Sequence, residues 1–371
     1  MPRRFAVVLT VSLAAATALP LALALALVRE PGGSGVVTGT IWVANEGSDS
    51  LTAIDAGTHA VVTVLHGVSA PHNVQASPDG ATVWATSPSR DAVAVIDAST
   101  LTVMGIVRTG AGPAHVVLTP DGGTALVTNA DADSLTIVDA TRLQAVTDVA
   151  TGSYPHGLRA SPDGRTSLVA DMGGTTVTLV DLDTGTAPAA VEVGRSPVQV
   201  AFAPDGAFAY ATVNGEDAVV KIDVRQRRVV GRAKVGRGPV QLAVTPDAST
   251  LVVASQGVEA RPNDEVSLID TETMRVTAVL ATGAGAHGVA IEPSGRQAFV
   301  TDVWAGDVAV IDLAARRVVD RIPVGGEPNG VSFSPLVQPH ARGAANMDSP
   351  LERTLPLGGA TDGESGSHSH G

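Results

Sequence analysis

The 371-residue chain contains no cysteine. It therefore has no disulfide bond, thiolate metal site or iron–sulfur cluster, and no cysteine for nucleophilic catalysis or for a lipoprotein anchor. Aromatic residues make up only 3% of the chain, and 24 basic residues face 37 acidic ones, for a formal net charge of −13. Because binding to phosphate backbones needs a basic surface, we expect no nucleic-acid partner.

Several enzyme signatures are missing as well. The sequence has no G-x-S-x-G elbow, no H-E-x-x-H zinc motif, no phosphate-binding loop and no dinucleotide fingerprint. No catalytic residue is therefore assigned from motifs.

The two ends of the chain differ from its middle. Arg3 and Arg4 precede an apolar run from Phe5 to Val28, which predicts a signal peptide or signal anchor over residues 1–30 and a linker over 31–39. The rest of the protein is then extracytoplasmic (secreted, periplasmic or cell-surface) and touches a membrane only through an uncleaved N-terminal segment. Residues 336–371 are rich in Gly, Ser, Pro and Ala and predict a disordered tail.

Between these ends the sequence repeats itself. The segment PHNVQASPDG lies at 71–80. Variants of it recur at 113–122, 155–164, 197–206, 239–248, 286–295 and 328–335, in steps of 42, 42, 42, 42, 47 and 42. A second landmark, a hydrophobic pair ending in aspartate, keeps the same six steps at Asp55, Asp97, Asp139, Asp181, Asp223, Asp270 and Asp312. Two landmarks in one register establish an internal repeat with a five-residue insertion near 257–264.

Each repeat holds four short runs of strand-forming residues bounded by turn residues. In the second unit these are His72–Ser77, Ala81–Thr86, Ala92–Asp97 and Val103–Thr109. Four strands in about 42 residues predict a β-propeller blade. The first unit has three strands, from Ile41, and the last has one, Asn329–Ser334, so together they complete a blade. We expect an all-β, seven-bladed propeller over residues 40–335, closed by strands from both ends.

Polar residues recur where each inner strand begins, on the face called the top here. One residue comes from each blade: His72, His115, His156, Gln199, Gln241, His287 and Asn329. A second ring lies at the ends of the second strands and comprises Asn45, Asn129, Asp171, Asn214, Gln256 and Asp302, with Glu46, Asp131, Glu216 and Trp304 just beyond. Since the inner strands converge on one axis, these residues are candidates for ligand binding at the top rim.

Three interpretations of this rim remain open. The polar residues could only hydrogen-bond the backbone that connects the blades. The histidines His72, His115, His156 and His287 could hold copper or zinc, although the fold requires no cofactor. A histidine (His72, His156 or His287) could also act with Asp171 or Asp302 in acid–base hydrolysis.

The unit P-H-G-h-x-x-S-P-D-G, followed by a strand ending in a polar residue and by h-x-h-I-D-x-x-T, resembles the YVTN-type propeller repeats of YncE-like and surface-layer proteins. Val83–Ser87 and Leu126–Asn129 stand where that family has Tyr-Val-Thr-Asn, and the resemblance covers residues 40–335. It implies a seven-bladed propeller. Relatives by fold include extracytoplasmic binding proteins, a lactonase branch and the copper-bearing propeller of nitrous oxide reductase, which has more histidines and a cysteine-containing cupredoxin module.

The function expected from these patterns is an exported binding or scaffold protein of the cell envelope. Its ligand lies at the top of the channel, and its partner is an envelope protein, a peptide or a glycan. A lactonase-like hydrolase and a copper- or zinc-binding propeller are the alternatives.

Overall fold

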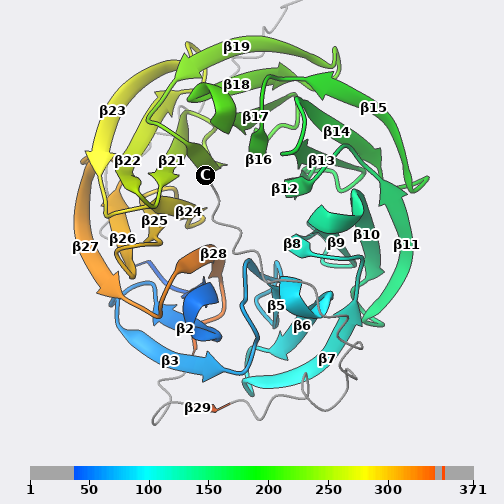
Figure 1. Cartoon of the computed structure of the whole chain (residues 1–371). Helices are drawn as coiled ribbons and strands as arrows, with labels where there is room; N and C mark the ends of the chain where they lie inside the picture. Colours follow the sequence, from blue (N-terminus) through cyan, green and yellow to red (C-terminus); the bar gives the residue numbers. More distant parts are fainter. Residues whose placement is uncertain (1–36, 339–344, 347–371) are drawn as a thin grey trace, which may run out of the picture. The chain divides into compact units, whose positions relative to one another are not determined.

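Seven antiparallel sheets surround a central channel in the computed structural model of the chain, which describes residues 37–338 and 345–346 (Figure 1). Each sheet has four strands, placed side by side in order from the channel to the outside. A fifth short strand extends one sheet. The all-β class, the seven blades and the four strands per blade confirm the prediction. In this part of the chain no helix has the length and apolarity to cross a membrane.

The blades follow one another along the chain, with the inner strand first in blades 2 to 7. Blade 1 comprises β1 (Thr40–Asn45), β2 (Ser50–Asp55), β3 (Val61–His66) and β28 (Pro328–Ser334). Blade 2 comprises β4 (Val74–Ala76), β5 (Thr82–Ser87), β6 (Ala92–Asp97) and β7 (Thr102–Arg108). Blade 3 comprises β8 (Pro113–Leu118), β9 (Thr124–Asn129), β10 (Ser134–Asp139) and β11 (Gln144–Ala150). Blade 4 comprises β12 (Pro155–Ala160), β13 (Thr166–Asp171), β14 (Thr176–Asp181) and β15 (Thr186–Glu192).

The remaining blades repeat the pattern. Blade 5 comprises β16 (Pro197–Phe202), β17 (Phe208–Val213), β18 (Ala218–Asp223) and β19 (Arg228–Lys234). Blade 6 comprises β20 (Pro239–Val244), β21 (Thr250–Val258), β22 (Arg261–Asp270) and β23 (Arg275–Ala281). Blade 7 comprises β24 (Ala286–Ile291), β25 (Gln297–Asp302), β26 (Asp307–Asp312) and β27 (Arg317–Pro323). Four short 3₁₀ turns follow second strands: η1 (Glu46–Ser48), η2 (Pro88–Arg90), η3 (Ala130–Ala132) and η4 (Asn214–Glu216).

Both ends of the repeat region close the ring, as predicted. Strand β28 pairs antiparallel with β1, and Ile41 lies opposite Phe333. Beyond β28 the chain stays attached, because Thr40 Oγ1 donates to Leu336 O (2.8 Å) and accepts from Gln338 N (3.0 Å). Strand β29 (Ala345–Asn346) pairs parallel with the outer strand β3. The predicted signal segment and most of the predicted tail lie outside the described residues.

The blades are held together by apolar clusters between their faces. Each of the seven clusters found among the described residues draws side chains from two neighbouring blades. The large residues Trp42, Trp84, Tyr210 and Phe299 lie in these clusters and are at most 2% exposed, so they pack blades rather than line a surface. Burial on both faces explains why strands such as VAVIDA lack a polar side.

The Pro-Asp-Gly turns behave as their chemistry predicts. Gly80 has φ 77° and Gly122 has φ 72°, a left-handed backbone that glycine adopts without strain. The landmark aspartates form Asx turns: Asp55 Oδ1, for example, accepts hydrogen bonds from the backbone N–H groups of Gly57 and Thr58.

A buried threonine fastens neighbouring blades in four places. Thr128 Oγ1, on β9, accepts from the N–H of His115 in its own blade (3.0 Å) and donates to the carbonyl of His156 in the next (2.6 Å). Thr86, Thr212 and Thr301 make the same pair of contacts in their blades. Since each hydroxyl satisfies two backbone groups that would otherwise be unpaired, it fixes the top of two inner strands.

Candidate metal centre at the top of the central channel

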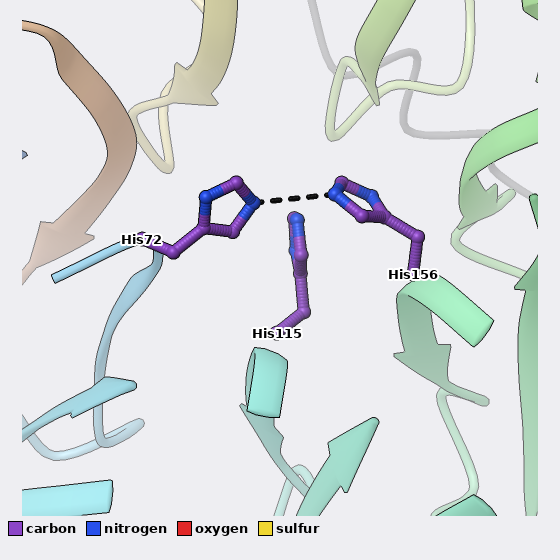
Figure 2. A group of neighbouring side chains, drawn as sticks. All are labelled: His72, His115 and His156. Atoms are coloured by element: carbon purple, nitrogen blue, oxygen red, sulfur yellow. Dashed lines mark hydrogen bonds between the residues drawn. The ribbon is translucent and has the colours of Figure 1, made fainter. Parts of the chain in front are cut away.

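Three buried histidines meet at the top of the channel (Figure 2). His72 precedes β4, His115 lies on β8 and His156 lies on β12; we call them the histidine trio. One ring nitrogen of each lies within 4.8 Å of those of the others. His72 Nε2 and His156 Nε2 are 3.2 Å apart, and His115 points between them. Residues more than 80 positions apart in the sequence therefore converge on one point.

A β-bulge brings the trio together despite its uneven spacing in the repeat. His72 and His156 occupy one repeat position, whereas His115 comes one place later. In blades 3 and 4 the register with the second strand shifts just there, between Pro113 and Val116 and between Pro155 and Leu158. Two inner-strand residues then face one partner residue, so both positions can reach the channel.

Glu46 is the charged partner of His72. Its Oε2 lies 3.0 Å from His72 Nδ1 and also accepts a hydrogen bond from Asn329 Nδ2. Burial would raise the pKa of Glu46, but the charge and hydrogen bond of His72, together with Asn329, lower it to about 2. For His72 burial lowers the pKa, and the Glu46 carboxylate outweighs it, so the net pKa is raised.

His115 differs from the other two members in its surroundings. It is 1% exposed, and neither of its ring nitrogens has a hydrogen-bond partner in the described structure. Burial, and then the neighbouring charges of His156 and His72, lower the pKa of His115 well below its usual value. A buried imidazole without a partner is costly unless something else accepts or supplies the missing contact.

The rings of the other two members, His72 and His156, are oriented by contacts to their Nδ1 atoms. His156 Nδ1 lies 3.3 Å from the carbonyl of Val198, and His72 Nδ1 faces Glu46. Metal-binding histidines commonly donate their second N–H to such a carbonyl or carboxylate, which fixes the tautomer and turns Nε2 toward the ion. The two Nε2 atoms that are left, 3.2 Å apart, face each other.

A cavity of about 340 Å³ adjoins the trio. Eight of the predicted rim residues line it: Glu46, His72, His156, Asn214, Gln256, His287, Trp304 and Asn329. The wall also includes residues that the sequence did not single out, chiefly Met172, Arg237, Glu259 and Glu327. Glu259 belongs to the insertion, which extends the β21–β22 hairpin over this side of the rim.

Two predicted rim residues lie away from the cavity wall. Gln199 is fully buried, and its Oε1 accepts from the N–H of Val200. A Cβ on Gly157 would lie 2.4 Å from that oxygen, so Gln199 fills the space left by the glycine in the neighbouring strand. Gln199 therefore packs between inner strands. Gln241 is 3% exposed.

Four members of the second predicted ring lie inside the blades, whereas Asn214 and Gln256 line the cavity. Asn129 Nδ2 donates to Ser134 and Thr136, and Asn45 repeats this with Ser50 and Thr52. Asp171 accepts from Thr176 and Thr178, and Asp302 accepts from Thr282. These four residues are fully buried. They link the second strand to the third, or to the segment after the outer strand, and do not line the cavity.

Sequence reasoning missed one contributor to this site and the partner of another. Glu46 was noted only as a neighbour of the second ring, and Thr128, which holds the backbone of both His115 and His156, was not recognised. A signal for the threonine exists: Thr86, Thr128, Thr212 and Thr301 occupy one repeat position.

Comparisons with known proteins agree on the fold. No curated protein sequence matches the chain. Hydrazine synthase of Kuenenia stuttgartiensis has a TM-score of 0.65 and 25% identity over 71% of this chain and 90% of that one. A functionally unknown protein from Desulfotomaculum acetoxidans has a TM-score of 0.70 and 15% identity, over 80% of this chain and 99% of that one. A protein from Bacteroides fragilis, proposed to be a 6-phosphogluconolactonase, has a TM-score of 0.69 and 18% identity, over 81% and 99%.

The last two structures are less than 25% identical and support the fold alone. The family model described as YNCE-like beta-propeller matches residues 80–289 and 256–335, which is more than half of the chain. With seven blades, a closing strand from the C-terminal end and the repeat motifs in register, the chain belongs to the YncE-like β-propeller family.

Proposed function

We propose that this protein is an exported propeller of the cell envelope that binds a ligand at the top of its central channel, with zinc or copper held by the histidine trio as part of the site. One observation carries the proposal: three buried imidazoles, from three blades, have ring nitrogens within 4.8 Å of one another. The hydrophobic N-terminal segment, with its two arginines, is the ground for export.

The spacing of the trio suits a small transition metal. Bonds of 2.0–2.1 Å in a tetrahedral site separate two ligand nitrogens by about 3.3 Å. The Nε2 atoms of His72 and His156 are 3.2 Å apart. Imidazole nitrogen suits zinc and copper, and the second N–H groups of both histidines already have partners of the usual kind. His115 would supply the third nitrogen and gain the contact it lacks.

Three protein ligands leave a fourth position of a tetrahedral ion for another molecule. His72 and His156 belong both to the trio and to the cavity wall, so a molecule in the cavity lies beside the ion. About 340 Å³ is at the small end of the range for ligand sites. A protein, peptide or glycan partner would therefore enter with one end group.

The hydrolase alternative is not favoured by the geometry. Asp171 and Asp302 were its expected carboxylates, but both make their hydrogen bonds to threonines within the blades. The carboxylate that does pair with a histidine is Glu46, whose low pKa of about 2 makes it a poor general acid.

Elemental analysis of protein purified from the export compartment tests the metal. A variant without the tail histidines, His368 and His370, serves as the parent, because flexible histidine pairs bind metal adventitiously. We expect about one zinc or copper per chain, and a loss in His115→Ala but not in His66→Ala, an exposed histidine on β3. Less than roughly 0.1 metal per chain in the parent would overturn the assignment, because a functional site should be filled.

Cell fractionation tests export separately. The propeller should be found in the envelope or the medium, and recovery of the protein in the cytoplasm would contradict this part of the proposal.

A further inference from the structure

An arginine without an acidic partner lies on the channel wall. Arg159 is on the inner strand β12, which borders the channel (Figure 1). Its neighbours Leu158 and Ala160 belong to the apolar cluster between blades 3 and 4, so Arg159, which alternates with them, points away from that cluster. The side chain is partly accessible, and its charge acts on His115, a residue of the neighbouring blade.

The guanidinium is underused by the protein. Its one hydrogen bond runs from Nη1 to the carbonyl of Leu158 (2.8 Å), and it forms no ion pair with a carboxylate of the described chain. An arginine has five N–H groups in a rigid fork, so four lack a protein acceptor. Burial lowers the pKa of Arg159 to about 10, which leaves it charged at neutral pH.

The other inner strands place no charged residue at this position of the repeat. Arg159 is the fifth residue of its repeat, counted from Pro155. The same position holds Ala201, Ala243 and Ala290 in three blades, Val117 in another, and Gln75 and Ser332 in the remaining two. Gln75 Nε2 donates to Ser332 Oγ (3.2 Å), so these two neutral side chains satisfy each other. Val117, Ala201 and Ala290 belong to apolar clusters between blades, so none of them offers the guanidinium an acceptor.

We propose that Arg159 forms a binding site for a small oxyanion, a phosphate or carboxylate group, inside the central channel. A guanidinium pairs with both oxygens of such a group through two parallel N–H bonds. The site is separate from the metal centre in its residues and does not depend on a bound ion. It gives an acidic protein an internal position that selects negative charge.

Calorimetric titration of the full-length protein with inorganic phosphate tests the site. Bound metal is first removed with EDTA, and the chelator is then removed by desalting, because EDTA is itself a polycarboxylate and would compete for the site. Chloride of equal ionic strength is the reference. Phosphate should bind the parent protein with one site per chain. Arg159→Met, which keeps the length of the side chain, should weaken binding at least tenfold.

Two further variants sharpen the result. Arg165→Met changes an exposed arginine of the same blade that is paired with Asp183, and it should bind phosphate as the parent does. Arg159→Lys keeps the charge but loses the planar fork, so binding should weaken by a smaller factor; it also replaces the methionine variant as the test if that variant does not fold. Absence of phosphate binding in the parent, or equal binding in the parent and the Arg159 variants, would overturn the proposal.

Discussion

Replacing Thr128 by valine should weaken both the stability of the propeller and its affinity for metal. Valine keeps the shape of threonine but removes the hydroxyl that accepts from His115 N and donates to His156 O. Both backbone groups belong to trio residues that are at least nine-tenths buried. The substitution therefore removes the fastening between two metal-binding strands without touching a ligand side chain.

The size of the effect follows from the contacts. Each buried polar group left without a partner costs about 1–3 kcal/mol. The two groups together predict a loss of about 2–4 kcal/mol in the free energy of unfolding, since the added methyl group recovers part of the cost. A small shift of His115 or His156 then separates the ring nitrogens, and we expect the dissociation constant for zinc to rise at least tenfold.

Thr212→Val is the matched control. Thr212 bridges Gln199 N (3.0 Å) and Val240 O (2.8 Å) in the same manner, but it joins blades that contribute no histidine to the trio. Chemical denaturation in EDTA should show similar losses of stability for both variants. Zinc titration should show weakened binding only for Thr128→Val. Equal zinc affinities in the two variants, or a stability loss below about 1 kcal/mol, would refute the reasoning.

Two other predictions concern acidic side chains. Glu46→Gln keeps an acceptor for His72 but removes the charge, so zinc affinity should fall by about 10–100-fold. Glu327→Gln, on the same cavity wall, should leave zinc affinity unchanged. A competition titration that shows the larger loss for Glu327→Gln would contradict the role of Glu46. Burial, with a contribution from Asp307, raises the pKa of Asp302. The folded state then keeps a proton that the unfolded state loses above about pH 4, so the unfolding free energy falls as pH rises, by up to about 1.4 kcal/mol per pH unit. Asp302→Asn should remove this decline in denaturation experiments at pH 5 to 8, and an unchanged pH profile would show that Asp302 is ionised in the folded protein.

The fold could be predicted because the repeat constrains it twice. The Pro-Asp-Gly turns and the landmark aspartates mark both ends of the strands. A shift of one residue would turn every side chain of a strand to the opposite face of the sheet, so a constant repeat length leaves little freedom in the strand register. The incomplete first and last units predicted that β28 would pair with β1, which the structure confirms.

The site could be predicted only in part. The sequence indicated that His72, His115, His156 and His287 would approach one axis, but it did not show which of the four would come close enough to share a metal ion. The structure separates them: three share one point, while His287 Nδ1 faces the carbonyl of Asn329. It also places Asp171 and Asp302 inside the blades, which sequence position could not distinguish from the rim.

The sequence by itself determined the number of blades, their strand order and the way the ring closes. These properties follow from local turn chemistry and from a period that is written seven times. Only the tertiary structure decided which side chains meet in the channel and which carboxylate faces a histidine. Those contacts join residues of different blades, and their geometry depends on bulges and on packing across blade faces, which no single repeat encodes.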